Sequence, residues 1–139
     1  MLKVTVSASG RLKEPYWQAA CAEYEKRLAA YCKLSVLEVP DGKPPECPGG
    51  AFRVALCSEG DMPDSLEFAR LLQTWQNRGV SSVCFLIGGS EGLPEAVKSQ
   101  ADYRLSLSRM TWPHHMVRAM LEEQIYRAMN VLAGGKYDK

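Results

Sequence analysis

The sequence has no long hydrophobic run. No apolar stretch approaches the roughly 20 residues that a membrane-spanning helix needs. The first residues, Met1 to Val4, lead into a strand-like alternation rather than a signal peptide. These features predict a soluble cytoplasmic protein without a membrane partner.

The sequence also has no excess of charge of one sign. Lys and Arg number 17 and Asp and Glu number 16, so the net charge is +1. A basic tail or an acidic solvating segment is therefore excluded as the source of function. Repeats and low-complexity tracts are also absent, and whole-chain charge identifies no partner.

Metal-binding and disulfide patterns are missing too. The five cysteines are odd in number and form no CxxC pair, which predicts neither a disulfide framework nor a thiolate metal site. Cys57 and Cys84 lie in apolar runs and are expected in the core. His114 and His115 are adjacent, so their side chains point in different directions, and no third ligand has suitable spacing. We expect no metal.

Periodicity predicts an α/β fold. With 139 residues, 46% of them hydrophobic, the chain is expected to form one domain over residues 1–139. Patterns typical of strands cover residues 2–8, 34–39, 52–57, 83–87 and 103–107, and helical patterns cover residues 15–31, 64–79, a short segment after Pro94, and 116–132. The spacing of Asp64 and Glu67 predicts a capping box, and Leu66, Ala69, Leu72 and Trp75 are expected to form the apolar face of that helix. This alternation predicts a mostly parallel sheet with helices on both faces.

Ligands of such sheets bind beyond the carboxyl ends of strands, here the loops after Cys57, Ile87 and Leu107. The glycine loop, residues 88–92, would let backbone N–H groups approach a ligand closely. It has neither the GxGxxG pattern nor the GK[ST] of a P-loop, so a plain strand-to-helix turn explains it about equally well.

The last helix carries a charged cluster. Arg118, Glu122 and Tyr126 follow one another at i, i+4 positions, and so do Glu123 and Arg127. A solvated face with helical ion pairs is the simplest interpretation. The segment from Arg104 to Lys139 has six basic and three acidic residues, so two such ends in a dimer are also able to present a basic surface to RNA.

Together these features resemble the SPOUT methyltransferases, and within them the RlmH family, which methylates N3 of a pseudouridine in 23S rRNA. The resemblance lies in residues 85–93 (FLIGGSEGL), in residues 105–108 (LSLS) with 110–114 (MTWPH), and in Val117-Arg118 followed by residues 123–128 (EQIYRA). It covers most of the chain and is looser in the amino-terminal half.

The resemblance implies a SPOUT-type α/β knot, in which a carboxyl-terminal trefoil knot forms the S-adenosylmethionine pocket, and a homodimer acting on 23S rRNA of the large subunit or ribosome. The cofactor residues that it implies are Leu56, Gly88, Gly89, Leu107, Ser108, Arg109, Met110, Thr111 and Trp112. Among catalytic residues, Arg118 is expected to orient RNA phosphate or the developing anion, and Tyr137 to lie near the target base. His114 is a candidate base because its ordinary pKa suits proton transfer near neutral pH, although a hydrogen-bonded loop histidine is an equally good interpretation.

The chain departs from the family pattern at three places. Residues 40–52 are shorter than in typical relatives, Asp138 replaces a histidine of the tail, and Trp112 stands where a smaller aliphatic residue is usual. Two alternatives therefore stay open. One is a SPOUT enzyme acting on another rRNA or tRNA base, and the other is a knotted RNA-binding protein without catalysis.

Overall fold

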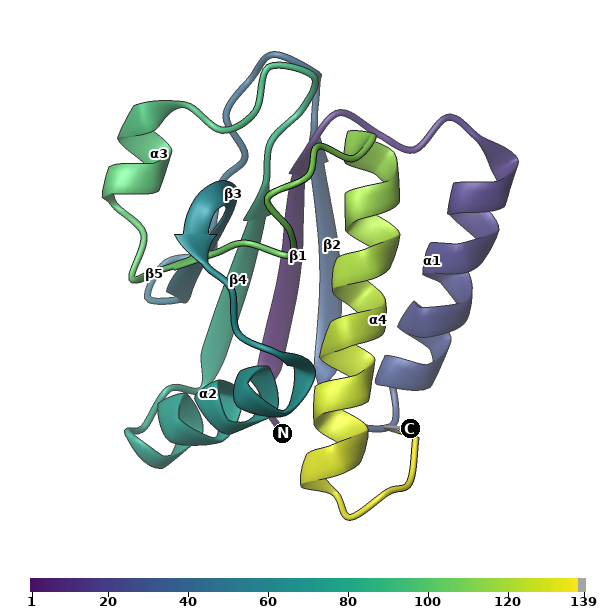
Figure 1. Cartoon of the computed structure of the whole chain (residues 1–139), viewed down its shortest axis with the longest axis vertical. Coiled ribbons are helices and arrows are strands. Elements are labelled where there is room, and N and C mark those ends of the chain that lie inside the picture. The colour runs from purple at the N-terminus through teal and green to yellow at the C-terminus, as the bar shows by residue number, and fades with distance from the viewer. Residues whose placement is uncertain (138–139) are drawn as a thin grey trace.

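Five strands form one sheet in which every neighbouring pair is parallel (Figure 1). The computed structural model describes residues 1–137. The strands are β1 (Lys3–Ser9), β2 (Lys33–Val39), β3 (Phe52–Asp61), β4 (Ser82–Ile87) and β5 (Tyr103–Leu105), and their spatial order is β2-β1-β4-β3-β5. Because all strands run the same way, their carboxyl ends meet at one edge, at the top of Figure 1.

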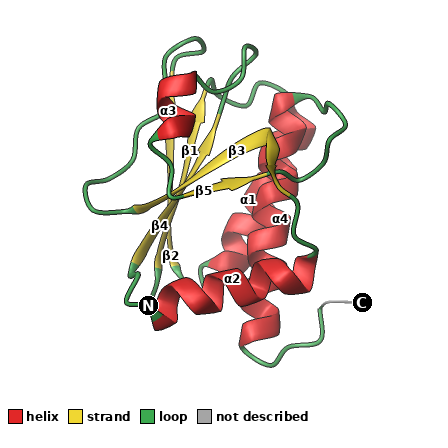
Figure 2. Cartoon of the chain, turned by 60° about the vertical axis from the view of Figure 1, so that its left-hand side comes forward, coloured by secondary structure: helices red, strands yellow, loops and turns green. Residues whose placement is uncertain are grey.

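The helices divide unequally between the two faces of the sheet (Figure 2). On one face lie α1 (Pro15–Leu28), α2 (Ser65–Asn77) and α4 (His114–Leu132), which enclose the main core with Val4, Val6, Phe85 and other strand residues. Among residues 1–137, the other face carries the short helix α3 (Glu95–Ser99) and the loop around Cys47, packed over Ala55, Cys84 and Leu86. The predicted α/β architecture is confirmed, whereas the threading of the knot stays a prediction.

Helix α2 begins as its sequence predicts. The Asp64 side chain accepts from the Glu67 backbone N–H at 2.8 Å, and the Glu67 side chain accepts from the Asp64 backbone N–H at 2.8 Å. The expected apolar face is wrong at Leu66, which is 44% exposed. Phe68 is buried instead. At about 100° per residue, Leu66 points more than a third of a turn away from the middle of the buried stripe, whereas Phe68 lies within it.

Four other expectations need correction. Helix α1 ends at Leu28 rather than at Tyr31, although the Tyr31 ring still packs against the core. Strand β3 continues to Asp61 instead of turning after Cys57, and its pairing with β5 shifts register beyond Leu56. Cys57 is consequently half-buried and not a core thiol, while Cys84 is fully buried as expected. Helix α4 begins at His114 rather than at Met116, directly after Pro113, where a missing N–H costs nothing.

Candidate functional site

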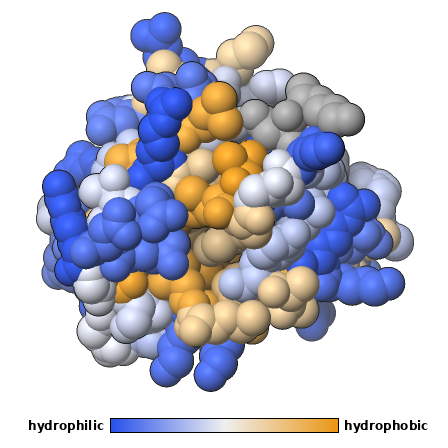
Figure 3. All heavy atoms as spheres, turned by 90° about the horizontal axis from the view of Figure 1, so that it is seen from below, coloured by the Kyte–Doolittle hydropathy of each residue, from blue (hydrophilic) through white to orange (hydrophobic). Residues whose placement is uncertain are grey.

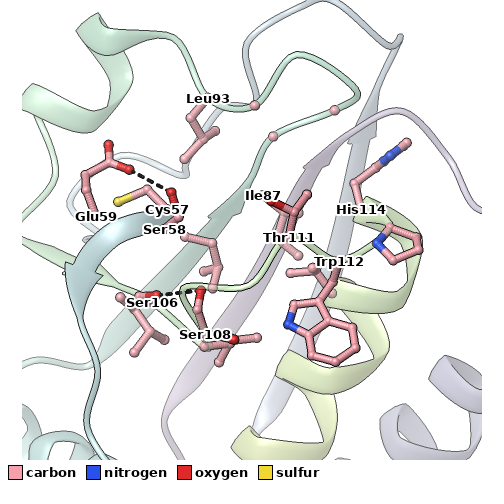
Figure 4. A pocket seen from close by; sticks show the side chains of 18 of the residues that line it. Cys57, Ser58, Glu59, Ile87, Leu93, Ser106, Ser108, Thr111, Trp112 and His114 are labelled. Atoms are coloured by element: carbon pink, nitrogen blue, oxygen red, sulfur yellow. Dashed lines mark hydrogen bonds between the residues drawn. The ribbon is translucent and has the colours of Figure 1, made fainter.

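The carboxyl ends of β3 and β4 and the loop after β5 surround one cavity of about 520 Å³ (Figure 4). This volume lies within the range usual for small-molecule sites, roughly 300–1,000 Å³. The fold class predicts that a ligand binds at the loops after Cys57, Ile87 and Leu107. The structure brings these three loops together around the cavity.

Most of the residues expected to bind the cofactor line this cavity. They are Leu56, Gly88, Gly89, Leu107, Ser108, Met110, Thr111 and Trp112. Arg109 is not among the lining residues, although it lies between two that are.

The glycine loop is shaped by close approaches within the chain itself. A Cβ at Gly88 would collide with the backbone of Gly92 and Leu93. A Cβ at Gly89 would collide with Asp41 Oδ1 and lie 3.1 Å from Ser9 Oγ. Packing of the loop therefore requires glycine at position 88, where the collision is with backbone. At position 89 a Cβ would force the Asp41 side chain to move away from the loop.

Asp41, in the loop after β2, holds the glycine loop from outside. Its carboxylate accepts hydrogen bonds from the Ser90 backbone N–H at 3.2 Å and from Ser90 Oγ at 3.0 Å. These bonds hold the pKa of the Asp41 carboxyl below its usual value. The segment between β2 and β3 is thus coupled to the mouth of the cavity.

The loop after β5 is ordered by two serines. Ser106 Oγ donates to the Ser108 carbonyl at 3.0 Å, and Ser108 Oγ accepts from the Met110 backbone N–H at 3.0 Å. The turn leaves Met110 71% exposed and Trp112 39% exposed at the cavity. Large apolar surfaces are therefore available at the rim for a planar or aliphatic group.

Sequence reasoning missed one polar wall of the cavity. It consists of Cys57, Ser58 and Glu59 on the extension of β3, and of Lys98 on α3. The Lys98 Nζ donates to Glu59 Oε1 at 2.6 Å, which lowers the pKa of Glu59. The signal for the first three was their place after a buried strand, but nothing in the sequence marked Lys98.

His114 lines the cavity from the first turn of α4. Burial lowers the pKa of its imidazole below the ordinary value, so the ring is neutral at pH 7. Contrary to the expectation that these neighbours point in different directions, the rings of His114 and His115 pack together with centroids 4.1 Å apart. The His115 Nδ1 lies 2.6 Å from Glu14 Oε1, just before α1. Of the pair, His114 is the one that borders the cavity.

Arg118 lies one turn further along α4 and does not line the cavity. It is 3% exposed, and its guanidinium donates to Glu38 Oε2 at 2.6 Å and to the Gly10 carbonyl at 3.1 Å. The expected ion pair with Glu122 on a solvated face is therefore wrong, because α1 packs over this side of α4 and buries both groups. The pair expected between Glu123 and Arg127 is confirmed at 2.6 Å.

Tyr137 lies near the other end of α4. Its backbone N–H donates to Asn130 Oδ1 at 3.0 Å, and its ring centroid is 4.8 Å from that of Tyr126. Since Tyr126 follows His114 by about 18 Å along the helix axis, one chain does not bring Tyr137 to the cavity. Asp138, the tail position that departs from the family pattern, lies outside the described residues.

Comparison with known proteins agrees with the geometry. The family model described as predicted SPOUT methyltransferase matches residues 2–138. Proteins named ribosomal RNA large subunit methyltransferase H from Clostridium botulinum strains 657, Langeland and Okra are each 38% identical to this chain. Each alignment spans 159 residues and covers 99% of this chain and 100% of the relative. The chain belongs to the SPOUT methyltransferase family.

Proposed function

We propose that this protein is a ribosomal RNA methyltransferase that uses S-adenosylmethionine to methylate N3 of a pseudouridine in 23S rRNA. The observation that carries the proposal is the cavity at the carboxyl ends of β3, β4 and β5, in a chain of this family. The relatives' printed name supports a large-subunit rRNA substrate. An rRNA substrate also implies that the protein works in the cytoplasm.

The cavity fits the proposed cofactor in size and in chemistry. Loop backbone at Gly88, Gly89 and Leu107 through Trp112 offers hydrogen-bonding groups for an adenine edge and for polar groups. Leu56, Ile87 and Val117 supply apolar contact surface. When bound, S-adenosylmethionine supplies an activated methyl group, so the protein's own tasks are to position the base and to accept the N3 proton.

His114 is the side chain that we assign to proton acceptance. It borders the cavity, and its lowered pKa keeps the imidazole unprotonated at neutral pH. An imidazole has to be neutral before it can accept a proton as a general base.

Arg118 has a positioning role in this proposal. Its guanidinium is buried and paired with Glu38, and it also acts on His114 electrostatically, so we assign to it the stabilisation of negative charge that develops beside His114. Direct contact with an RNA phosphate requires the pair with Glu38 to open.

The expected role of Tyr137 near the target base requires a homodimer. One chain keeps this ring on Tyr126 and Arg127, away from its own cavity, so only a second copy is able to deliver it. Seen from the end opposite the cavity, apolar side chains gather at the centre of a polar surround (Figure 3), but a copy seated on that face would lie away from the cavity, so the contact that delivers Tyr137 has to lie elsewhere.

Mass spectrometry of RNA from a strain lacking the gene tests substrate and reaction together. We expect one methylated pseudouridine in the large-subunit rRNA to lose its methyl group, and the wild-type gene to restore it. A change confined to tRNA or to another rRNA base would redirect the proposal to a different SPOUT substrate. Unchanged RNA would favour a binding protein without catalysis.

A further inference from the structure

Three ligand-type side chains meet between α1 and α4, outside the cavity. Cys21 and Glu25 are four residues apart and share one face of α1. Glu122 faces them from α4. One ligand atom from each residue, the Cys21 sulfur and one oxygen of each carboxylate, lies within 4.8 Å of the other two.

Glu122 is a buried carboxylate without a hydrogen-bond partner among the residues that the structure describes. It is 0% exposed, and neither carboxylate oxygen has a hydrogen-bond partner among residues 1–137. Burial of a carboxylate without a partner is strongly unfavourable.

The nearest cation does not meet this need. Arg118 lies one turn earlier on α4, but its donors are directed to Glu38 and to the Gly10 carbonyl. Glu25 and Cys21 add negative charge or a weak donor, not a counter-charge. Glu122 therefore requires either a proton or a bound cation between the two helices.

We propose that Cys21, Glu25 and Glu122 bind one divalent transition-metal ion of the zinc class. A thiolate in the ligand set favours zinc over magnesium or calcium, which prefer oxygen ligands. Tetrahedral zinc with usual bond lengths places its ligand atoms roughly 3.3–3.7 Å apart. The three ligand atoms, which lie within 4.8 Å of one another, would reach these separations by small rotations of their side chains.

Charge and exposure favour such an ion. With Cys21 as the thiolate and both carboxylates ionised, the ligand set would carry three negative charges, two of which a divalent ion offsets. Arg118 lies close enough to act on both Glu122 and Cys21 electrostatically, although its direct partner is Glu38. Glu25 is half-buried, so this side of the cluster reaches solvent, and a zinc ion held by three protein ligands would take a water as its fourth.

This three-residue site differs from the metal sites that the sequence argues against, which are a thiolate site built on a CxxC pair and a site at His114 and His115. Spacing rules look for ligands close together in the chain, whereas α1 and α4 contribute ligands about 100 residues apart. None of the three residues lines the cavity. The ion would therefore tie α1 to α4, and the proposal does not depend on methyltransferase activity.

Metal titration of the untagged full-length chain, first freed of metal with a chelator, tests the proposal. We expect one Zn²⁺ per chain by competition with a chromophoric chelator, and a higher thermal unfolding midpoint with Zn²⁺ than without. We expect Co²⁺ to give a thiolate-to-cobalt charge-transfer band. Such a band separates this site from any binding by His114 and His115, which have no sulfur.

Matched variants decide between this site and others. Glu122→Gln keeps the side-chain volume and is expected to weaken Zn²⁺ binding at least tenfold or so, whereas Glu123→Gln, on the next residue of α4, is expected to leave it unchanged. Cys21→Ser is expected to remove the cobalt–thiolate band, and Cys32→Ser, which alters another cysteine that is 2% exposed, to retain it. The wild type failing to bind Zn²⁺, or a band that survives Cys21→Ser, would overturn the proposal and assign a proton to Glu122.

Discussion

Individual side chains at the cavity are held by partners that are remote in the sequence. At the cavity, Asp41 holds Ser90 and Lys98 holds Glu59; one turn along α4 from His114, Glu38 holds Arg118. Each pair joins segments that lie far apart in the sequence. The site is therefore sensitive to single substitutions that look peripheral in the sequence.

Gly89→Val is expected to abolish S-adenosylmethionine binding. The new side chain would displace Asp41 and the loop that it holds, because a Cβ at this position already collides with Asp41 Oδ1. Calorimetry measures the affinity, and Gly49→Ala is a suitable control because a Cβ there meets nothing within 4 Å. Unchanged affinity in a folded Gly89→Val protein would remove the glycine loop from the cofactor site.

His114→Gln is expected to remove the acid limb of the pH–rate profile. Burial lowers the pKa of His114 below its ordinary value of 6.5, so the wild-type rate should fall as the pH drops through a value below 6.5, where the imidazole becomes protonated and cannot accept the N3 proton. Single-turnover methylation of ribosomes across this pH range provides the measurement. An acid limb of the same position in His114→Gln would exclude His114 as the base.

Arg118→Ala is expected to lower methyl transfer by about tenfold, less than the roughly 100-fold that follows the loss of a donor in direct contact with the developing charge, because Arg118 does not line the cavity. Affinity for S-adenosylmethionine should change little, since Arg118 does not line the cavity. Glu38→Gln is the companion variant, because it weakens the ion pair but keeps the guanidinium. Equal turnover by wild type and by Arg118→Ala would remove Arg118 from the mechanism.

At the scale of elements, the ends of the helices determine where side chains arrive. Helix α4 begins at His114 beside the cavity and carries Arg118 and Glu122 under α1. Helix α2 is joined to α4 by a hydrogen bond of 2.7 Å from Ser65 Oγ to Gln124 Oε1, directly after the Asp64 cap. Correct formation of the first turn of α2 thus also positions the middle of α4.

Asp64→Ala is expected to reduce the free energy of unfolding by about 1 kcal/mol, because it removes the acceptor for the Glu67 backbone N–H and so breaks the capping box. Urea denaturation provides the measurement. Glu91→Ala changes another carboxylate, which is exposed, and is expected to be nearly neutral. A destabilisation of Asp64→Ala no larger than that of Glu91→Ala would show that the cap contributes little.

At the scale of the whole molecule, the cavity and the described end of the tail lie near opposite ends of α4. We found no helix among residues 1–137 long and apolar enough to cross a membrane. We propose that a second copy of the chain brings its Tyr137 to the cavity. The active unit in this proposal is a dimer.

Light scattering is expected to give the mass of two chains of 15.4 kDa at micromolar concentration. Two strongly impaired variants, His114→Gln, which keeps the residual rate used for its pH profile, and Tyr137→Phe, are expected to complement each other when mixed and allowed to exchange subunits. Half of the dimers are then mixed, each with one intact site, so about a quarter of wild-type activity should return. A monomer mass, or no recovery despite demonstrated exchange, would contradict a site shared between subunits.

The sequence by itself determined the elements, their order and the loops that form the cavity. Local patterns are sufficient for these features: apolar runs mark β3 and β4, Asp64 and Glu67 mark a helix start, and glycines mark the loop after Ile87. Because parallel strands end at the same edge, element order alone predicted where these loops would meet.

Only the tertiary structure decided which charges are buried and which groups they meet. Helical spacing paired Arg118 with Glu122, but packing of α1 against α4 directed Arg118 to Glu38 and left Glu122 beside Cys21 and Glu25. It also placed Tyr137 far from His114 within one chain. Desolvation and the approach of remote segments are properties of the packed molecule, and local sequence spacing does not encode them.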